Sequence, residues 1–196
     1  GTLLYAPGKR SVLGRQLIRV DREGKASIAS EEPDAFMELL AVSPDGRWAA
    51  VTTLRRRMEL WVTDLQTGGR TLVDGASESY GAAFSPDGQR LAYSRLQHLK
   101  DPGIMRIAIW DRASGAVTEP ALEDGSWSVS SWTPDGSSLI ATYSPRARMG
   151  QAMDIRGASL SPTPEATVLV GSPEFVWGGK ASPDGKWLLY GAVEAG

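Results

Sequence analysis

The sequence AAFSPDGQRLAY, residues 82–93, reads as two short apolar strands around a tight turn. In the turn, Pro86 sets the backbone φ of the first central position and Asp87 can bond its own backbone two residues on. Gly88 takes the positive φ that other residues resist. The runs on either side show the partial alternation that is typical of β-strands. The stretch therefore predicts a β-hairpin.

Nearly the same phrase occurs four times in the chain of 196 residues. Its turns fall at residues 43–46, 85–88, 133–136 and 182–185, with spacings of 42, 48 and 49 residues. A third strand-like run follows most hairpins, as in MELWVTDL, MRIAIWDR and AMDIRGASL, and a weaker fourth run comes after it. Four strands in a repeat of this length are typical of a propeller blade. A β-sandwich with fortuitous turns would not repeat one phrase at a near-constant spacing.

We therefore predict an all-β fold, a β-propeller of four-stranded antiparallel blades with SPDG turns, within a single domain that spans residues 1–196. The ends of the chain both carry the second strand of a blade, which indicates a partial propeller from a larger ring. Exposed strand edges of such a fragment would favour self-association. The predicted boundaries are three complete blades at 36–74, 79–122 and 127–171, and two partial blades at 1–32 and 174–196.

Composition argues against several classes of function. The formal net charge of −2 provides no field to attract nucleic acid or an acidic membrane surface. The absence of cysteine excludes disulfides, thiol catalysis and cysteine-bound zinc. His98 is the one histidine, and no Gly-x-Ser-x-Gly motif or Asp-x-Asp-x-Asp-Gly loop accompanies it. We predict no catalytic residue, no cofactor and no metal site in this chain.

The repeat phrase AFSPDGQRLAY, with IAIWDRASG after it, resembles the WD-like repeats of TolB-type bacterial propellers. The opening GTLLYAPG, followed by LIRVDREGK, is similar to the start of the propeller attached to many bacterial serine/threonine protein kinases. That resemblance implies an extracytoplasmic or periplasmic sensor module of a membrane-anchored kinase. Related repeats also occur in periplasmic TolB and in prolyl oligopeptidase-like peptidases, so a scaffold and a peptidase gate remain alternatives. The chain has no kinase motif of its own.

One face of the predicted propeller carries variable loops, where function usually lies. Basic residues are expected in its outer loops, and acidic residues such as Asp34, Glu123 and Asp124 nearer the channel. This mixed surface favours a protein or peptide partner, because an acidic ring would repel nucleic-acid phosphates. Nothing indicates direct membrane contact. The candidate binding residues are Arg55, Arg56, Arg57, Tyr80, Arg95, His98, Lys100, Trp127, Arg146, Arg148, Phe175 and Trp177.

Two further sets of residues have structural predictions. The turn aspartates are expected to stabilise their own turns, and they are Asp45, Asp87, Asp135 and Asp184. Five tryptophans fall inside predicted strands and are expected to pack between blades, namely Trp48, Trp61, Trp110, Trp132 and Trp187. Trp127 and Trp177 stand near the start of a first strand, where an exposed aromatic side chain could anchor a partner.

Overall fold

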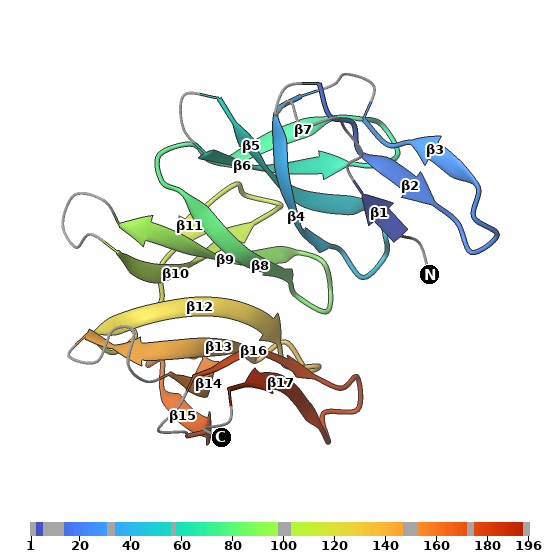
Figure 1. The fold of residues 1–196 in the computed structure, drawn as a ribbon. Coiled ribbons are helices and arrows are strands. Elements are labelled where there is room, and N and C mark those ends of the chain that lie inside the picture. Colours follow the sequence, from blue (N-terminus) through green and yellow to red (C-terminus); the bar gives the residue numbers. More distant parts are fainter. Residues whose placement is uncertain are drawn as a thin grey trace. The chain divides into compact units, whose positions relative to one another are not determined.

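The computed structural model describes residues 3–5, 14–30, 34–55, 58–97, 103–146, 153–171 and 175–193. Over these residues the regular secondary structure is antiparallel β-sheet, and no helix among them is long and apolar enough to cross a membrane. The chain divides into two compact units, residues 1–79 and residues 80–196. Figure 1 shows the strands of both units.

The first unit holds two sheets whose strands are neighbours in chain order. The three-stranded sheet consists of β1 (Leu3–Tyr5), β2 (Ile18–Val20) and β3 (Ala26–Ile28). The four-stranded sheet consists of β4 (Phe36–Val42), β5 (Trp48–Leu54), β6 (Met58–Asp64) and β7 (Arg70–Asp74). Leu17, Phe36 and Val51 belong to the apolar core of this unit.

The second unit holds two four-stranded sheets and a two-stranded sheet, again in chain order. The first has β8 (Ser79–Phe84), which starts at the boundary between the units, β9 (Arg90–Gln97), β10 (Ile104–Asp111) and β11 (Val117–Thr118). The next has β12 (Gly125–Trp132), β13 (Ser138–Pro145), β14 (Asp154–Ser159) and β15 (Ala166–Val170). The last has β16 (Val176–Ala181) and β17 (Leu188–Ala192). Across the two units, the described strands thus form three four-stranded sheets, one three-stranded sheet and one two-stranded sheet.

All four SPDG turns have the same internal hydrogen bonds. The turn glycine donates its N–H to the carbonyl oxygen of the first residue at 2.8–2.9 Å, and its φ lies between 68° and 72°. The hydroxyl of that first residue donates to the aspartate Oδ1 at 2.5–2.6 Å. The same Oδ1 accepts the backbone N–H two residues on at 3.0–3.2 Å. Asp45, Asp87, Asp135 and Asp184 thus each lie within their own turn.

In the second unit, β13 is buried on both of its faces. Leu139, Ala141 and Tyr143 belong to a core shared with the sheet of β8 to β11. Ile140, which alternates with them, packs instead with Val176 of the last sheet. Successive side chains of a strand point to opposite faces, so a strand that is apolar throughout requires a sheet on each side.

The tryptophans of the predicted interfaces differ in their surroundings. Trp110 and Trp132 are buried, and the indole Nε1 of Trp132 donates to the carbonyl oxygen of Ala83 at 2.8 Å. Trp48 and Trp61 are partly buried. Trp187, however, is 75% exposed, so the prediction that it packs between blades is wrong. It precedes β17 on a face that no described part of the chain covers.

Gly179 of the last sheet lies directly against side chains of the sheet of β12 to β15. A Cβ at this position would lie 2.8 Å from Cγ2 of Ile140 and 2.9 Å from Cγ2 of Ile155. We expect Gly179→Ala to lower the free energy of unfolding by about 1–3 kcal/mol, since the added methyl group overpacks the interface. Urea denaturation measures this loss. The control is Gly171→Ala, where the nearest atom would lie at 3.4 Å and little change is expected.

Ser85 tests how much a buried turn contributes to stability. Its hydroxyl is fully buried, donates to Asp87 and accepts the N–H of Arg90 at 2.9 Å. We expect Ser85→Ala to lower the free energy of unfolding by about 2 kcal/mol, because the substitution removes the two hydrogen bonds that the buried hydroxyl makes with Asp87 and the Arg90 N–H. Ser182 makes the same bonds in a more exposed turn. A loss from Ser182→Ala as large as that from Ser85→Ala would contradict burial as the cause.

Candidate functional site

Opposite charges meet where the first and second strands of a sheet come together. Gly125 of β12 pairs with Pro145 of β13, so Asp124 and Arg146 flank the open end of this hairpin. The Nε of Arg146 lies 2.8 Å from Oδ2 of Asp124. In the first unit, Asp34 precedes β4 and Arg55 follows β5, and the two side chains approach to 3.2 Å. Both ion pairs therefore follow from antiparallel pairing, which brings the start of the first strand next to the end of the second.

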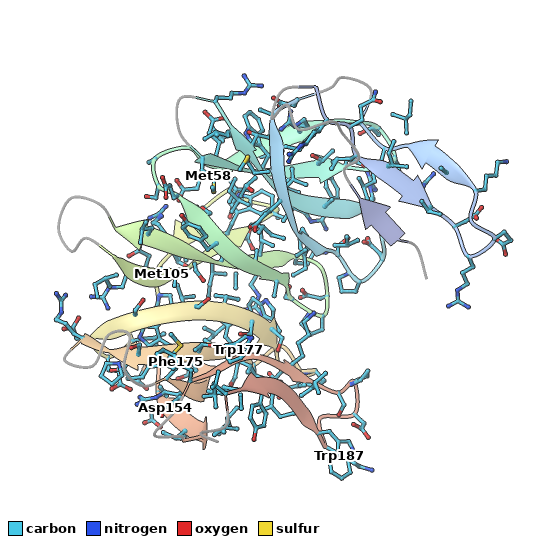
Figure 2. All side chains as sticks on the ribbon, in the orientation of Figure 1. Met58, Met105, Asp154, Phe175, Trp177 and Trp187 are labelled. Carbon is cyan, nitrogen blue, oxygen red and sulfur yellow. The ribbon has the colours of Figure 1, made fainter. Side chains whose placement is uncertain are left out.

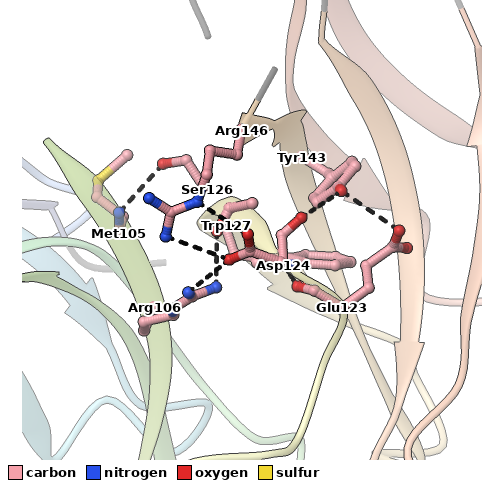
Figure 3. A network of polar contacts seen from close by, with 9 residues as sticks. Met105, Arg106, Glu123, Asp124, Ser126, Trp127, Tyr143 and Arg146 are labelled. Atoms are coloured by element: carbon pink, nitrogen blue, oxygen red, sulfur yellow. Dashed lines mark hydrogen bonds and ion pairs between the residues drawn. The ribbon is translucent and has the colours of Figure 1, made fainter. Parts of the chain in front are cut away.

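A second arginine reaches Asp124 from the neighbouring sheet of the same unit. Arg106 of β10 places one guanidinium nitrogen 2.9 Å from Oδ1 of Asp124 and donates from the other to the carbonyl oxygen of Gly125 at 2.9 Å. Figure 3 shows Arg106 and Arg146 converging on the one carboxylate. Hydrogen bonds from Arg146 and then Arg106 lower the pKa of Asp124 from 3.8 to about 2.

Glu123, the residue before Asp124, is held by a different set of side chains. The Tyr143 hydroxyl donates to the carbonyl oxygen of Asp124 at 2.8 Å and lies 3.3 Å from Oε2 of Glu123. Burial, and then the negative charge of Glu123, raises the pKa of Tyr143. Arg156 pairs with Glu123 and stacks over the Tyr143 ring at 3.8 Å. These contacts fix the backbone and side chains of residues 123–124 at the mouth of the hairpin.

A hollow of about 310 Å³ opens beside these residues, and we call it the Asp124 pocket. Arg95 of β9 lies opposite Arg106 and forms an ion pair of 2.7 Å with Glu119 at the rim. The lining thus combines charged groups with apolar side chains, an arrangement suited to recognising a polar chain with some apolar bulk. The residues that line it are Arg106, Ile107, Glu119, Pro120, Ala121, Leu122, Asp124 and Trp127.

Of the predicted binding residues, Trp127 lines this pocket, and Arg95 and Arg146 form ion pairs with its lining residues Glu119 and Asp124. Tyr80 is half-buried in β8, while Phe175 and Trp177 are exposed on the last sheet. Arg55 belongs to the first unit and pairs with Asp34. The remaining predicted residues lie outside the described part of the chain, and they are Arg56, Arg57, His98, Lys100 and Arg148.

Two expectations about this surface are wrong. Trp127 is only 1% exposed, because its ring packs against Tyr143 in the core and its Nε1 donates to the Glu123 carbonyl oxygen at 3.2 Å. Trp127 therefore lines the Asp124 pocket from its buried position and is not an exposed anchor for a partner. Basic and acidic residues are also not segregated between outer loops and channel, because strand pairing brings Arg146 onto Asp124.

Sequence reasoning did not select Arg106, Glu119 or Asp124 as binding residues. Arg106 stands inside an apolar strand motif, and its antiparallel partner Arg95 can be placed only when the register is known. One signal in the sequence could have indicated the site. The acidic pair Glu123–Asp124 stands just before β12, and Arg146 stands just after β13. Among the described residues, no group of three or more histidine, cysteine, aspartate or glutamate side chains is placed to hold a metal ion.

Comparison with known proteins defines the fold. No family model matches the sequence, and no curated protein matches it. Among solved structures, TolB from Acinetobacter baumannii is similar with a TM-score of 0.74 at 21% identity, over 97% of this chain and 46% of that one. The fold is a TolB-type β-propeller. The predicted fold class is thereby confirmed.

Two other propeller-containing structures extend the comparison. A protein of Agrobacterium tumefaciens assigned as TolB has a TM-score of 0.75 at 19% identity, over 91% of this chain and 63% of that one. An acylaminoacyl peptidase from Pyrococcus horikoshii has a TM-score of 0.59 at 15% identity, over 89% of this chain and 31% of that one. The chain thus spans less than two thirds of each of these structures, and identities at this level establish the TolB-type fold alone.

The lowered pKa of Asp124 makes its ion pairs sensitive to acid. The arginines bind the carboxylate form, so their stabilising effect is complete above the ordinary pKa and is lost as the pH falls through about 2. We expect a carbon-detected NMR titration of the Asp124 carboxyl group to give a midpoint near pH 2. Arg146→Gln should move that midpoint upward, whereas Lys186→Gln should leave it unchanged. A wild-type midpoint at 3.8 would contradict the arrangement.

Proposed function

We propose that this propeller is a non-catalytic binding module for proteins or peptides and that the Asp124 pocket binds an extended segment of the partner. The pocket supports the proposal because it combines a recess of about 310 Å³ with charged groups held in place by neighbouring strands. Groups that are already ordered lose little entropy when a partner binds. Function in such folds is usually carried by sites placed on a rigid scaffold.

The charge distribution indicates what the partner segment carries. The side chain of Asp124 is 59% exposed, against 24% for Arg106, and Glu119 is likewise more exposed than its partner Arg95. Arg106 and Arg95 are therefore less exposed than the carboxylates that they orient, whereas Arg146, with 46% of its side chain exposed, lies at the surface beside Asp124. A segment with lysine or arginine side chains beside an apolar residue fits this surface, since opposite charges align partners and exclude competitors.

The parent protein that we propose is a bacterial receptor-type serine/threonine kinase, with the propeller as its extracytoplasmic sensor. The similarity of GTLLYAPG and LIRVDREGK to kinase-attached propellers supports this setting. A periplasmic scaffold and the gate of a peptidase are the alternatives, and the likeness to an acylaminoacyl peptidase favours considering the second. Sequencing the coding region on both sides distinguishes them. A kinase domain with a membrane span upstream supports the sensor, and a hydrolase domain downstream supports the gate.

A peptide library displayed on phage tests the binding function directly. The immobilised chain should enrich peptides that contain lysine or arginine next to an apolar residue. The selected peptides should bind the double variant Asp124→Asn with Glu119→Gln about tenfold more weakly, a loss of about 1.4 kcal/mol of binding free energy. Because exposed charges are screened by salt, affinity should also fall as ionic strength rises.

The matched control is Glu165→Gln, which removes one exposed carboxylate away from the pocket. It should leave the affinity of the selected peptides unchanged. Peptides that bind the pocket variant and the wild-type chain equally well would place binding elsewhere on the molecule. Failure to enrich any sequence above an unrelated propeller of similar net charge would argue against a peptide-binding role.

A further inference from the structure

The fourth strand of the sheet of β8 to β11 is shorter than its counterparts. β11 has two residues, whereas β7 and β15 have five each, and it pairs with Ile109 and Trp110 near the end of β10. Continued in the same register, this strand would place Pro120 opposite Ile107. Proline has no backbone N–H to donate, so it ends the pairing at that position. The Leu122 N–H donates to the Pro120 carbonyl oxygen at 2.9 Å, which turns the chain at this point.

Backbone hydrogen bonds show which groups of β10 face the edge that β11 leaves open. The N–H of Asp111 donates to the carbonyl oxygen of Ala116 at 2.9 Å, on the side of β11. Alternate residues of a strand direct their N–H and C=O groups to the same side. The backbone groups of Ile109, Ile107 and Met105 therefore face that side as well.

The backbone groups on either side of Ile107 have partners. Ile109 pairs with Thr118 of β11, and the Met105 N–H donates to Oγ of Ser126 at 3.1 Å. Figure 2 labels Met105 on β10, and Figure 3 shows its bond to Ser126. Among the described residues, neither the N–H nor the carbonyl oxygen of Ile107 has a hydrogen-bond partner. Ile107 is 3% exposed, and unpaired polar groups at a buried position cost free energy that a pairing ligand would recover.

Ile107 also lines the Asp124 pocket, so its unpaired backbone groups lie beside the recess. We propose that a partner segment binds in this pocket as an added strand, one residue of which pairs with Ile107. The inference rests on the proposed peptide-binding function and specifies how the peptide is held. In an antiparallel pair, that residue accepts the Ile107 N–H and donates its own N–H to the Ile107 carbonyl oxygen. The position therefore excludes proline.

The two faces of β10 indicate which side chains the added strand carries. The Ile107 side chain belongs to an apolar core that includes Trp127. Arg106 alternates with Ile107 and so lies on the other face, where it pairs with Asp124. Residues that pair across strands place their side chains on the same face. The peptide residue opposite Ile107 is therefore apolar, and its neighbours point toward the Asp124 carboxylate, where a basic side chain fits.

N-methylated peptides test this arrangement by removing one backbone donor at a time. The probe is the blocked pentapeptide Thr-Lys-Val-Lys-Thr, whose valine corresponds to the residue opposite Ile107. Methylating the valine nitrogen should weaken binding about tenfold, because the donor to Ile107 is lost. Methylating either lysine nitrogen is the matched control and should have little effect, since those N–H groups point away from β10. NMR titration to millimolar peptide measures the affinities, and amide hydrogen exchange at Ile107 should slow when the unmodified peptide binds.

A variant of the chain tests the open edge from the protein side. Pro120→Thr restores a backbone N–H opposite Ile107 and allows β11 to extend. It should weaken binding of the pentapeptide without lowering the free energy of unfolding. The control is Pro162→Thr in an exposed loop between β14 and β15, which should bind like the wild type.

Two results would overturn the added strand. One is pentapeptide binding that withstands methylation of the valine nitrogen, which would leave recognition by side chains at the pocket intact. The other is absence of pentapeptide binding at millimolar concentration. The phage selection does not presuppose strand pairing, so it tests the proposed function separately from this inference.

Discussion

The structure depends on strands that are apolar on both faces. A sheet built from such strands cannot expose either side to water without losing the free energy of burial, so each sheet requires a neighbour on each side. β13 shows the constraint in one strand, where Leu139 and Ile140 point to opposite faces and are both buried between sheets. Within the second unit, repetition of one strand pattern thus places consecutive sheets face to face.

Stacking also determines where charged groups meet. In the second unit, the residue just before β12 lies near the strands of the preceding sheet. Asp124 consequently receives Arg146 from its own hairpin and Arg106 from the sheet before it. Two donors that are far from Asp124 in sequence stabilise its carboxylate. The same ion pairs hold the charged groups beside the pocket in fixed positions.

The hairpin turns show how local chemistry supports this arrangement. A serine or threonine hydroxyl, an aspartate and a glycine satisfy one another within four residues, which closes each hairpin in the same register. Register then decides which face each side chain of the strand occupies. Burial differs between otherwise identical turns, since Ser85 is enclosed and Ser182 is partly exposed. The turn sequence therefore determines the geometry of each turn, whereas burial by the neighbouring sheets determines how much the turn contributes to stability.

The amino-acid sequence by itself determined the repeat, the four-stranded sheets and the turn geometry, because these follow from contacts within about 45 residues and from residue types with narrow backbone preferences. Tertiary structure decided the rest. The sequence predicts an exposed Trp127 and a Trp187 packed between blades, yet Trp127 is buried against Tyr143 and Trp187 is 75% exposed. Pairing of Asp124 with Arg106 and Arg146 likewise depends on inter-strand register and on the neighbouring sheet. Burial and ion pairing are properties of surfaces that meet in space, and a strand pattern does not specify which surface will lie against it.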